Sequence, residues 1–154
     1  MPQQKANRFI SILYRYSQRY FTQHLRRIDC PIEVGEMSCF LQACRHPGIS
    51  QDGIAANLYM DKATVARTLQ RLEHSGYIRR EPCETDRRMN LIYATDQAEP
   101  IFRQLQELIE QYHQMLYAGM TEEEIQVAVQ MLIRMKENVS RTLRCRQEED
   151  QEER

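Results

Sequence analysis

Residues 50–93 read SQDGIAANLYMDKATVARTLQRLEHSGYIRREPCETDRRMNLIY, and this stretch determines the fold of the chain. It predicts a short helix, a turn, a second helix, a strand, a basic loop and a second strand. Ser50 can cap the first helix, expected to run through Leu58, because its hydroxyl can accept from free N–H groups of the first turn. Asp61 can cap the second helix in the same way.

The second helix is predicted to have one buried and one exposed face. Val65, Leu69 and Leu72 fall at i, i+4 and i+7, which places them on one apolar stripe. The opposite face carries Ala63, Thr64, Arg67, Gln70, Arg71 and His74. A helix anchored from behind that presents small, polar and cationic groups suits the major groove of DNA. Gly76 is expected to end this helix in the left-handed conformation.

A β-hairpin is predicted after the second helix. We expect its strands over Tyr77–Arg80 and Met89–Ala94. The connecting loop, residues 82–88, ends with two arginines, Arg87 and Arg88.

This stretch resembles the winged helix-turn-helix of the multiple-antibiotic-resistance regulator (MarR) family of bacterial transcription factors. The matching residues are Asp61–Arg67, Leu72-Glu73, Gly76–Arg80 and the wing signature Asp-x-Arg, met by Asp86 and Arg88. The amphipathic helices on both sides look like the dimerisation arms of that family, so the resemblance covers nearly the whole chain. It implies a mostly α protein with a small two-stranded β wing, a winged helix-turn-helix core and N- and C-terminal helical dimerisation arms.

Four regions are expected along the chain. They are an N-terminal helical arm (1–30), the winged helix-turn-helix core (31–95), C-terminal dimerisation helices (96–146) and an acidic disordered tail (147–154). The remaining helices are predicted over residues 5–28, over Val34–Arg45, from near Pro100 to Gly119, and from the capping box at Thr121 to about Cys145. The family usually has Leu-Thr-x-x-Gly at the start of the C-terminal arm, whereas this chain has Ala94-Thr95-Asp96-Gln97-Ala98.

Composition limits the function classes. The 154 residues carry a net charge of −1, and five acidic residues lie in the last eight positions. DNA binding would therefore rest on individually placed arginines and on doubling by a dimer, with clear salt dependence. No apolar run approaches the ~20 residues of a membrane span, and no signal peptide is visible. We expect a cytoplasmic protein.

Eight residues are predicted to contact DNA: Ser50, Lys62, Ala63, Thr64, Arg67, Arg71, Arg87 and Arg88. Thr64 and Arg67 are expected to meet base edges, because arginine can bind guanine through two hydrogen bonds. Lys62 and Arg71 are expected to meet phosphates, which position a protein without specifying sequence. The plain alternatives are a solvated helix face for these residues and a purely structural cap for Ser50.

The wing is predicted to enter or flank a minor groove through Arg88, with Arg87 beside it. Asp86 is expected to orient Arg88 by a charge-assisted hydrogen bond. The alternative is a flexible charged turn.

The resemblance also implies a ligand pocket, a dimer and a regulatory effect. Small aromatic or anionic effectors bind many family members, and the candidate contacts by position are Arg15, Tyr16, Tyr20, Met37 and Tyr112. An aromatic stripe at helical spacing is more commonly core, so both interpretations stay open. A two-fold dimer would place two recognition helices roughly 34 Å apart on a pseudo-palindromic duplex. The expected role is a repressor that an effector releases.

Other chemistries have little support. The five cysteines form no C-x-x-C pair and are expected to be reduced thiols, and the local sequence around Cys30 and Cys83 does not favour a thiolate. No histidine spacing suggests a metal site, and no catalytic constellation or cofactor motif is visible. The alternative to a DNA-binding regulator is a winged-helix protein-interaction module that does not read DNA.

Overall fold

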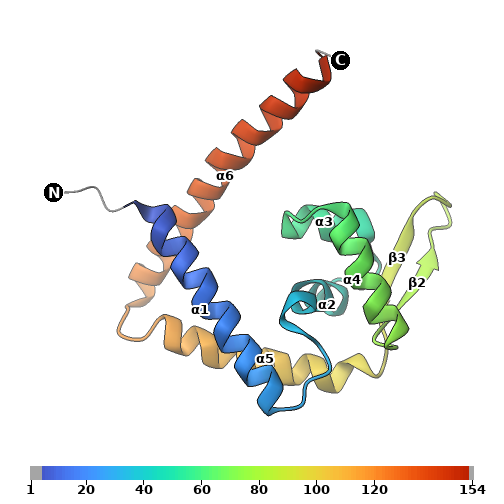
Figure 1. Ribbon diagram of the computed structural model, residues 1–154, viewed down its shortest axis with the longest axis horizontal. Coiled ribbons are helices and arrows are strands. Elements are labelled where there is room, and N and C mark those ends of the chain that lie inside the picture. Colours follow the sequence, from blue (N-terminus) through green and yellow to red (C-terminus); the bar gives the residue numbers. More distant parts are fainter. Residues whose placement is uncertain (1–4, 153–154) are drawn as a thin grey trace. The chain divides into compact units, whose positions relative to one another are not determined.

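The computed structural model describes residues 5–152, with side chains described through residue 143. The elements are α1 (Ala6–Arg27), α2 (Val34–Arg45), β1 (Ile49–Ser50), α3 (Gln51–Leu58), α4 (Lys62–His74), β2 (Ile78–Pro82), β3 (Asn90–Ala94), α5 (Ala98–Leu116) and α6 (Glu122–Glu152). The chain is mostly helical, as predicted (Figure 1). It divides into two compact units, Met1–Glu110 and Gln111–Arg154, which are described separately below.

The helix-turn-helix has the caps that the sequence predicts. The Ser50 hydroxyl accepts from the Gly53 N–H at 3.0 Å, which starts α3. Asp61 caps α4 by accepting from the Thr64 N–H at 2.9 Å. Gly76, at φ +81°, turns the chain out of α4 in the left-handed conformation that glycine tolerates best.

The sheet has three strands rather than the two predicted, in the order β1-β3-β2. β1 is only two residues long and pairs antiparallel with β3 through Ile49↔Ile92 and Ser50↔Leu91. β2 starts one residue later than predicted because the Tyr77 N–H bonds the Leu72 carbonyl and so belongs to the end of α4. It extends to Pro82, which is tolerated because β2 is an edge strand.

The core of the first unit lies between the helix-turn-helix, α2 and the sheet. Phe40, Ile54, Val65, Leu69 and Ile92 are completely buried there. The predicted apolar stripe of α4 is confirmed, since its third member is also buried. From outside this core, α1 contributes buried Phe21 and Leu25, and the first turns of α5 contribute buried Ala98, Ile101 and Leu105.

α5 begins at Ala98, two residues before the predicted start near Pro100. Pro100 is the third residue of the helix, where no intrahelical acceptor for its missing N–H is needed. Thr95 does not cap this helix through its hydroxyl. Its side chain instead donates to the Gly76 carbonyl at 2.6 Å, and its N–H bonds the Tyr77 carbonyl at 3.0 Å. The end of β3 is thereby tied to the end of α4.

In the second unit, Gly119 at φ +79° separates the end of α5 from α6. The predicted capping box is confirmed: the Thr121 N–H donates to Glu124 Oε2 at 2.8 Å, and the Glu124 N–H donates to Thr121 Oγ1 at 3.2 Å. α6 runs to Glu152 and so includes residues 147–152, where a disordered tail was predicted. Neither glycine nor proline interrupts this segment, and glutamate, glutamine and arginine are good helix formers. Residues 153–154 lie outside the described part of the chain.

Candidate nucleic-acid interface

The outward face of α4 presents the residues that the sequence selects. Lys62, Ala63, Arg67 and Arg71 are exposed, and Thr64 is half-buried. The aliphatic residues behind them are fixed in the core, so the backbone of this helix is held while its polar face remains open to solvent.

A chain of hydrogen bonds joins the cap of α4 to the two predicted base-reading residues. The Thr64 hydroxyl donates to Asp61 Oδ2 at 2.5 Å, and an Arg67 terminal nitrogen donates to Thr64 Oγ1 at 3.2 Å. The hydrogen bonds from the Thr64 side chain and backbone hold the pKa of the Asp61 carboxyl below its usual value. An ionised Asp61 therefore keeps Thr64 and Arg67 in one arrangement on the exposed face.

The two predicted phosphate-contacting residues of α4 both pair with carboxylates. Lys62 Nζ lies 3.0 Å from Asp52 Oδ2, and both side chains are well exposed. Arg71 Nε lies 3.0 Å from Glu36 Oε1, and that carboxylate belongs to α2 and is nearly buried. The exposed Lys62–Asp52 pair is weak, so a phosphate can readily replace the Asp52 carboxylate. The Arg71–Glu36 pair is instead part of the packing between α2 and α4.

The wing tip is an ordered turn, but Asp86 acts differently from the prediction. Its Oδ1 accepts from the backbone N–H of Arg88 at 2.9 Å rather than from the guanidinium. The Met89 N–H closes the turn by donating to the Asp86 carbonyl at 2.9 Å. An aspartate at the first position of such a turn is favoured for this backbone contact. Asp86 thus shapes the turn that displays Arg87 and Arg88, which are both exposed.

The other arginines of the hairpin are used within the fold. Arg79 lies over the ring of Tyr93, 4.6 Å from its centroid, and forms an ion pair with Glu81. Arg80 Nε lies 3.2 Å from a carboxylate oxygen of Glu73 on α4. These contacts fasten the hairpin to itself and to α4.

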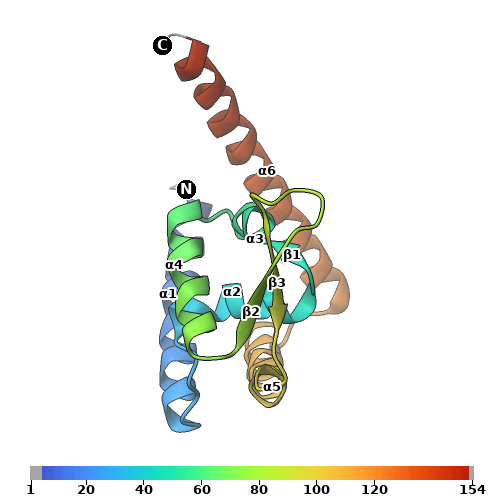
Figure 2. The same ribbon diagram turned by 90° about the vertical axis from the view of Figure 1, so that its right-hand side faces the viewer.

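The predicted recognition helix α4, called the reading helix below, and the tip of the wing lie on the same side of the first unit. In Figures 1 and 2 the N-terminal end of α4, the end joined to α3, and the tip of the β2–β3 hairpin both lie toward the top of the view. A single DNA duplex could therefore meet both elements.

The wing also contains a cysteine whose ionisation differs from the prediction. Hydrogen bonds from the Thr85 hydroxyl and from the N–H groups of Thr85 and Asp86 lower the pKa of the Cys83 thiol. The expectation for Cys30 is confirmed, since burial raises its pKa. Burial also raises the pKa values of Cys39 and Cys44 to about 11. The error for Cys83 arose because the sequence shows the neighbouring acid but not the donors that the folded turn supplies.

The five residues predicted to bind a ligand do not line a common cavity among those described here. Arg15 and Tyr16 are exposed on α1, and Met37 is half-buried on α2. Tyr20 stacks on His24 with ring centroids 3.9 Å apart, as a structural aromatic would. Tyr112 belongs to the second compact unit. Their role in ligand binding stays a prediction.

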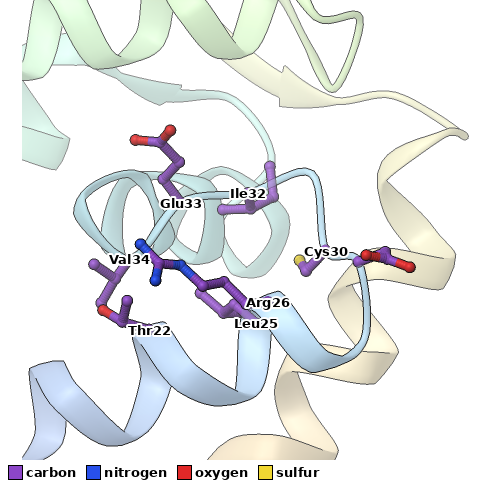
Figure 3. A pocket seen from close by; sticks show the side chains of 8 residues that line it. Thr22, Leu25, Arg26, Cys30, Ile32, Glu33 and Val34 are labelled. Atoms are coloured by element: carbon purple, nitrogen blue, oxygen red, sulfur yellow. The ribbon is translucent and has the colours of Figure 1, made fainter.

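A cavity of about 570 Å³ lies instead between the end of α1 and the start of α2. It is lined by Thr22, Leu25, Arg26, Asp29, Cys30, Ile32, Glu33 and Val34. Figure 3 shows the Arg26 side chain extending from α1 toward Val34 at the start of α2. The cavity combines an aliphatic lining with one cation and two carboxylates. Its size falls in the range of small-molecule sites.

Comparison with known proteins identifies the family. A model of the MarR family matches residues 32–89. A crystal structure of MarR is 30% identical, covers 92% of this chain and 99% of its own, and superposes with a TM-score of 0.69.

The chain belongs to the MarR family.

Two further comparisons agree with this result. The transcriptional regulator SlyA is 26% identical over 90% of this chain and 96% of its own, with a TM-score of 0.82. A putative MarR family regulator from Listeria monocytogenes, solved with a 26mer DNA, is 20% identical over 89% of this chain and 90% of its own, with a TM-score of 0.82, and so shares the fold. Membership of the MarR family makes this chain a DNA-binding transcriptional regulator and not an enzyme.

Between residues 5 and 152, no helix is long and apolar enough to cross a membrane. Within the same range, no group of three or more histidine, cysteine or acidic side chains is arranged to hold a metal ion.

Proposed function

We propose that this MarR-family protein is a cytoplasmic homodimer that binds a pseudo-palindromic DNA operator and represses transcription until a small aromatic or anionic effector releases it. The observation that carries the proposal is the outward face of α4. There Thr64 and Arg67 are linked to each other and to the helix cap, above a completely buried aliphatic stripe.

On this proposal, α4 enters the major groove. Arg67 uses its remaining N–H groups to bind guanine, and Ala63 contacts a thymine methyl. Lys62 exchanges its exposed partner Asp52 for a phosphate, which releases counterions from the duplex. Ser50 lies at the start of α3, where the free N–H groups of the helix end favour a phosphate.

The wing adds affinity with less sequence selectivity. The turn that Asp86 shapes holds Arg87 and Arg88 outward at the tip. Arginines in a narrow minor groove respond to groove width more than to individual bases.

The proposed homodimer is supported by large apolar side chains that are exposed to solvent in each unit. In the first unit, the N-terminal half of α1 exposes Phe9, Ile10, Leu13 and Tyr14, whereas its buried residues lie near the other end. In the second unit, α6 exposes Val127, Val129, Met131, Leu132, Ile133, Met135, Val139 and Leu143. Exposed large apolar side chains in this number on one helix indicate a protein–protein contact. A second copy of the chain would cover it.

The effector is proposed to occupy the cavity between α1 and α2. Its aliphatic residues, Leu25, Ile32 and Val34, suit an apolar or aromatic body, and Arg26 can meet an anionic group. A ligand there acts on DNA binding only if it prefers one spacing of the two recognition helices over another.

Selection of bound duplexes from a random pool tests the DNA proposal. It should return an inverted repeat with half-sites about one helical turn apart. With the selected duplex, Arg67→Ala should weaken binding by about 1–3 kcal/mol and relax selectivity at one base position in each half-site. The matched control is Arg103→Ala, which removes an exposed arginine of α5 that pairs with Glu99. Equal losses in the two variants would remove Arg67 from the reading surface.

Light scattering tests the dimer. The wild type should have the mass of two chains. Leu132→Glu places a charge on the exposed apolar surface of α6 and should yield single chains that bind the duplex weakly. A wild-type mass of one chain would refute the proposal.

A further inference from the structure

Glu36 is a nearly buried carboxylate in the first turn of α2, and it pairs with Arg71 of α4. It is 8% exposed, although it is only the third residue of α2. A charged group in such a position is unfavourable unless it is paired and hydrogen-bonded. The hydrogen-bond partners of its two carboxylate oxygens therefore indicate its structural role.

Each carboxylate oxygen has its own partner. Oε2 accepts from the Glu33 backbone N–H at 3.1 Å and completes the capping box of α2. Oε1 accepts from Nε of Arg71 at 3.0 Å, across 35 positions of sequence. One side chain thus joins the start of α2 to an arginine on the exposed face of α4.

The contact leaves most of the Arg71 guanidinium available. Arginine has five N–H donors in a planar fork, and the ion pair uses the one on Nε. The other four lie on the two terminal nitrogens, and the side chain is 61% exposed. A cavity of about 760 Å³ borders the pair, so Arg71 would have room to move if Glu36 did not hold it.

We propose that Glu36 is a positioning residue for DNA binding, which holds the Arg71 guanidinium so that its terminal N–H groups meet a backbone phosphate. The inference rests on the proposed binding of duplex DNA and adds to it a residue that has no contact with DNA. Carboxylate and phosphate would sit on different edges of one guanidinium, an arrangement that arginine allows and lysine does not.

Glu36→Gln is the informative substitution. Glutamine can also serve in a capping box, so its carbonyl oxygen can keep the bond to the Glu33 N–H. Its amide group then faces Nε of Arg71, and two donors cannot pair. The variant should keep the hydrogen bond that caps α2 and lose the hydrogen bond that orients Arg71.

Binding of the selected duplex is measured by fluorescence anisotropy at several salt concentrations, for wild type, Glu36→Gln, Arg71→Ala and the double variant. Arg71→Ala should weaken binding and lower the salt slope by about 1 for each protomer. As a single substitution, Glu36→Gln should weaken binding several-fold. In the Arg71→Ala background, the same substitution should cause no further loss of affinity. Arg71→Lys leaves α2 untouched and keeps the charge, but should lose nearly as much affinity as Arg71→Ala. Urea unfolding of each variant checks that the fold is retained.

Three results would overturn the inference. Tighter binding by Glu36→Gln would mean that the carboxylate competes with DNA for Arg71. Equal losses with and without Arg71 would mean that Glu36 acts through the fold alone. Full affinity in Arg71→Lys would mean that charge suffices and orientation is irrelevant. If instead the wild type binds no duplex selectively, the proposed function itself fails, and the inference fails with it.

Discussion

Replacing Leu69 by alanine should strongly destabilise the protein, because this side chain is completely buried at the back of α4. The substitution removes three carbon atoms from the core, which at about 0.8 kcal/mol for each amounts to about 2.4 kcal/mol. The space left behind adds to this loss, since the surrounding α2 and α3 can close it only in part. We therefore expect the free energy of unfolding to fall by about 3–4 kcal/mol.

Urea unfolding followed by circular dichroism measures this loss, with all samples at the same chain concentration because a dimer is stabilised by association. The melting temperature should fall by about 10 °C. Gln70→Ala is the matched control: it changes the next residue on the exposed face and should alter the free energy by less than about 0.5 kcal/mol. A loss below about 1 kcal/mol for Leu69→Ala would refute the packing that holds the reading helix.

Three further predictions follow from single groups. Arg88→Ala should weaken binding to most duplexes alike, as competition titrations with altered half-sites would reveal, and a loss confined to one base position would contradict a wing contact. The folded pKa of Asp61 lies below that of an ordinary aspartate, so its contribution to stability is complete above about pH 4 and is lost as the pH falls through the folded pKa. Asp61→Asn keeps a capping residue without this titration, and its urea midpoint should therefore change less between pH 5 and pH 2 than that of the wild type. In native protein, a maleimide followed by peptide mapping should modify Cys83 before Cys39, whose pKa is raised to about 11.

Local signals in the sequence were sufficient to predict most elements. The bounds of α2 were predicted correctly, and the caps at Ser50, Asp61 and Thr121 each need only a few neighbouring residues. The buried stripe of α4 follows from helical periodicity alone. These features depend on contacts within one turn of helix, which a sequence displays directly.

The remaining features depend on contacts that the sequence does not display. β1 has two residues, too few for an alternating pattern, and exists because β3 lies beside it. The pair of Glu36 and Arg71 joins positions far apart in the chain, so the sequence predicted a phosphate contact for Arg71 but could not show its carboxylate partner. The turn around Asp86 determined both its own hydrogen bond and the ionisation of Cys83, and neither could be predicted before the path of the backbone was known.

Ser50 has one further consequence. It pairs with Leu91 of β3 in the sheet and also caps α3, so the sheet and the helix-turn-helix share a residue. Residues 83–89 lie beyond the last paired positions, Pro82 and Asn90. Insertions or charge changes in that tip would leave the shared joint intact. Grafting tips from other winged proteins onto this scaffold should thus be a practical way to retune groove preference without redesigning the reading helix.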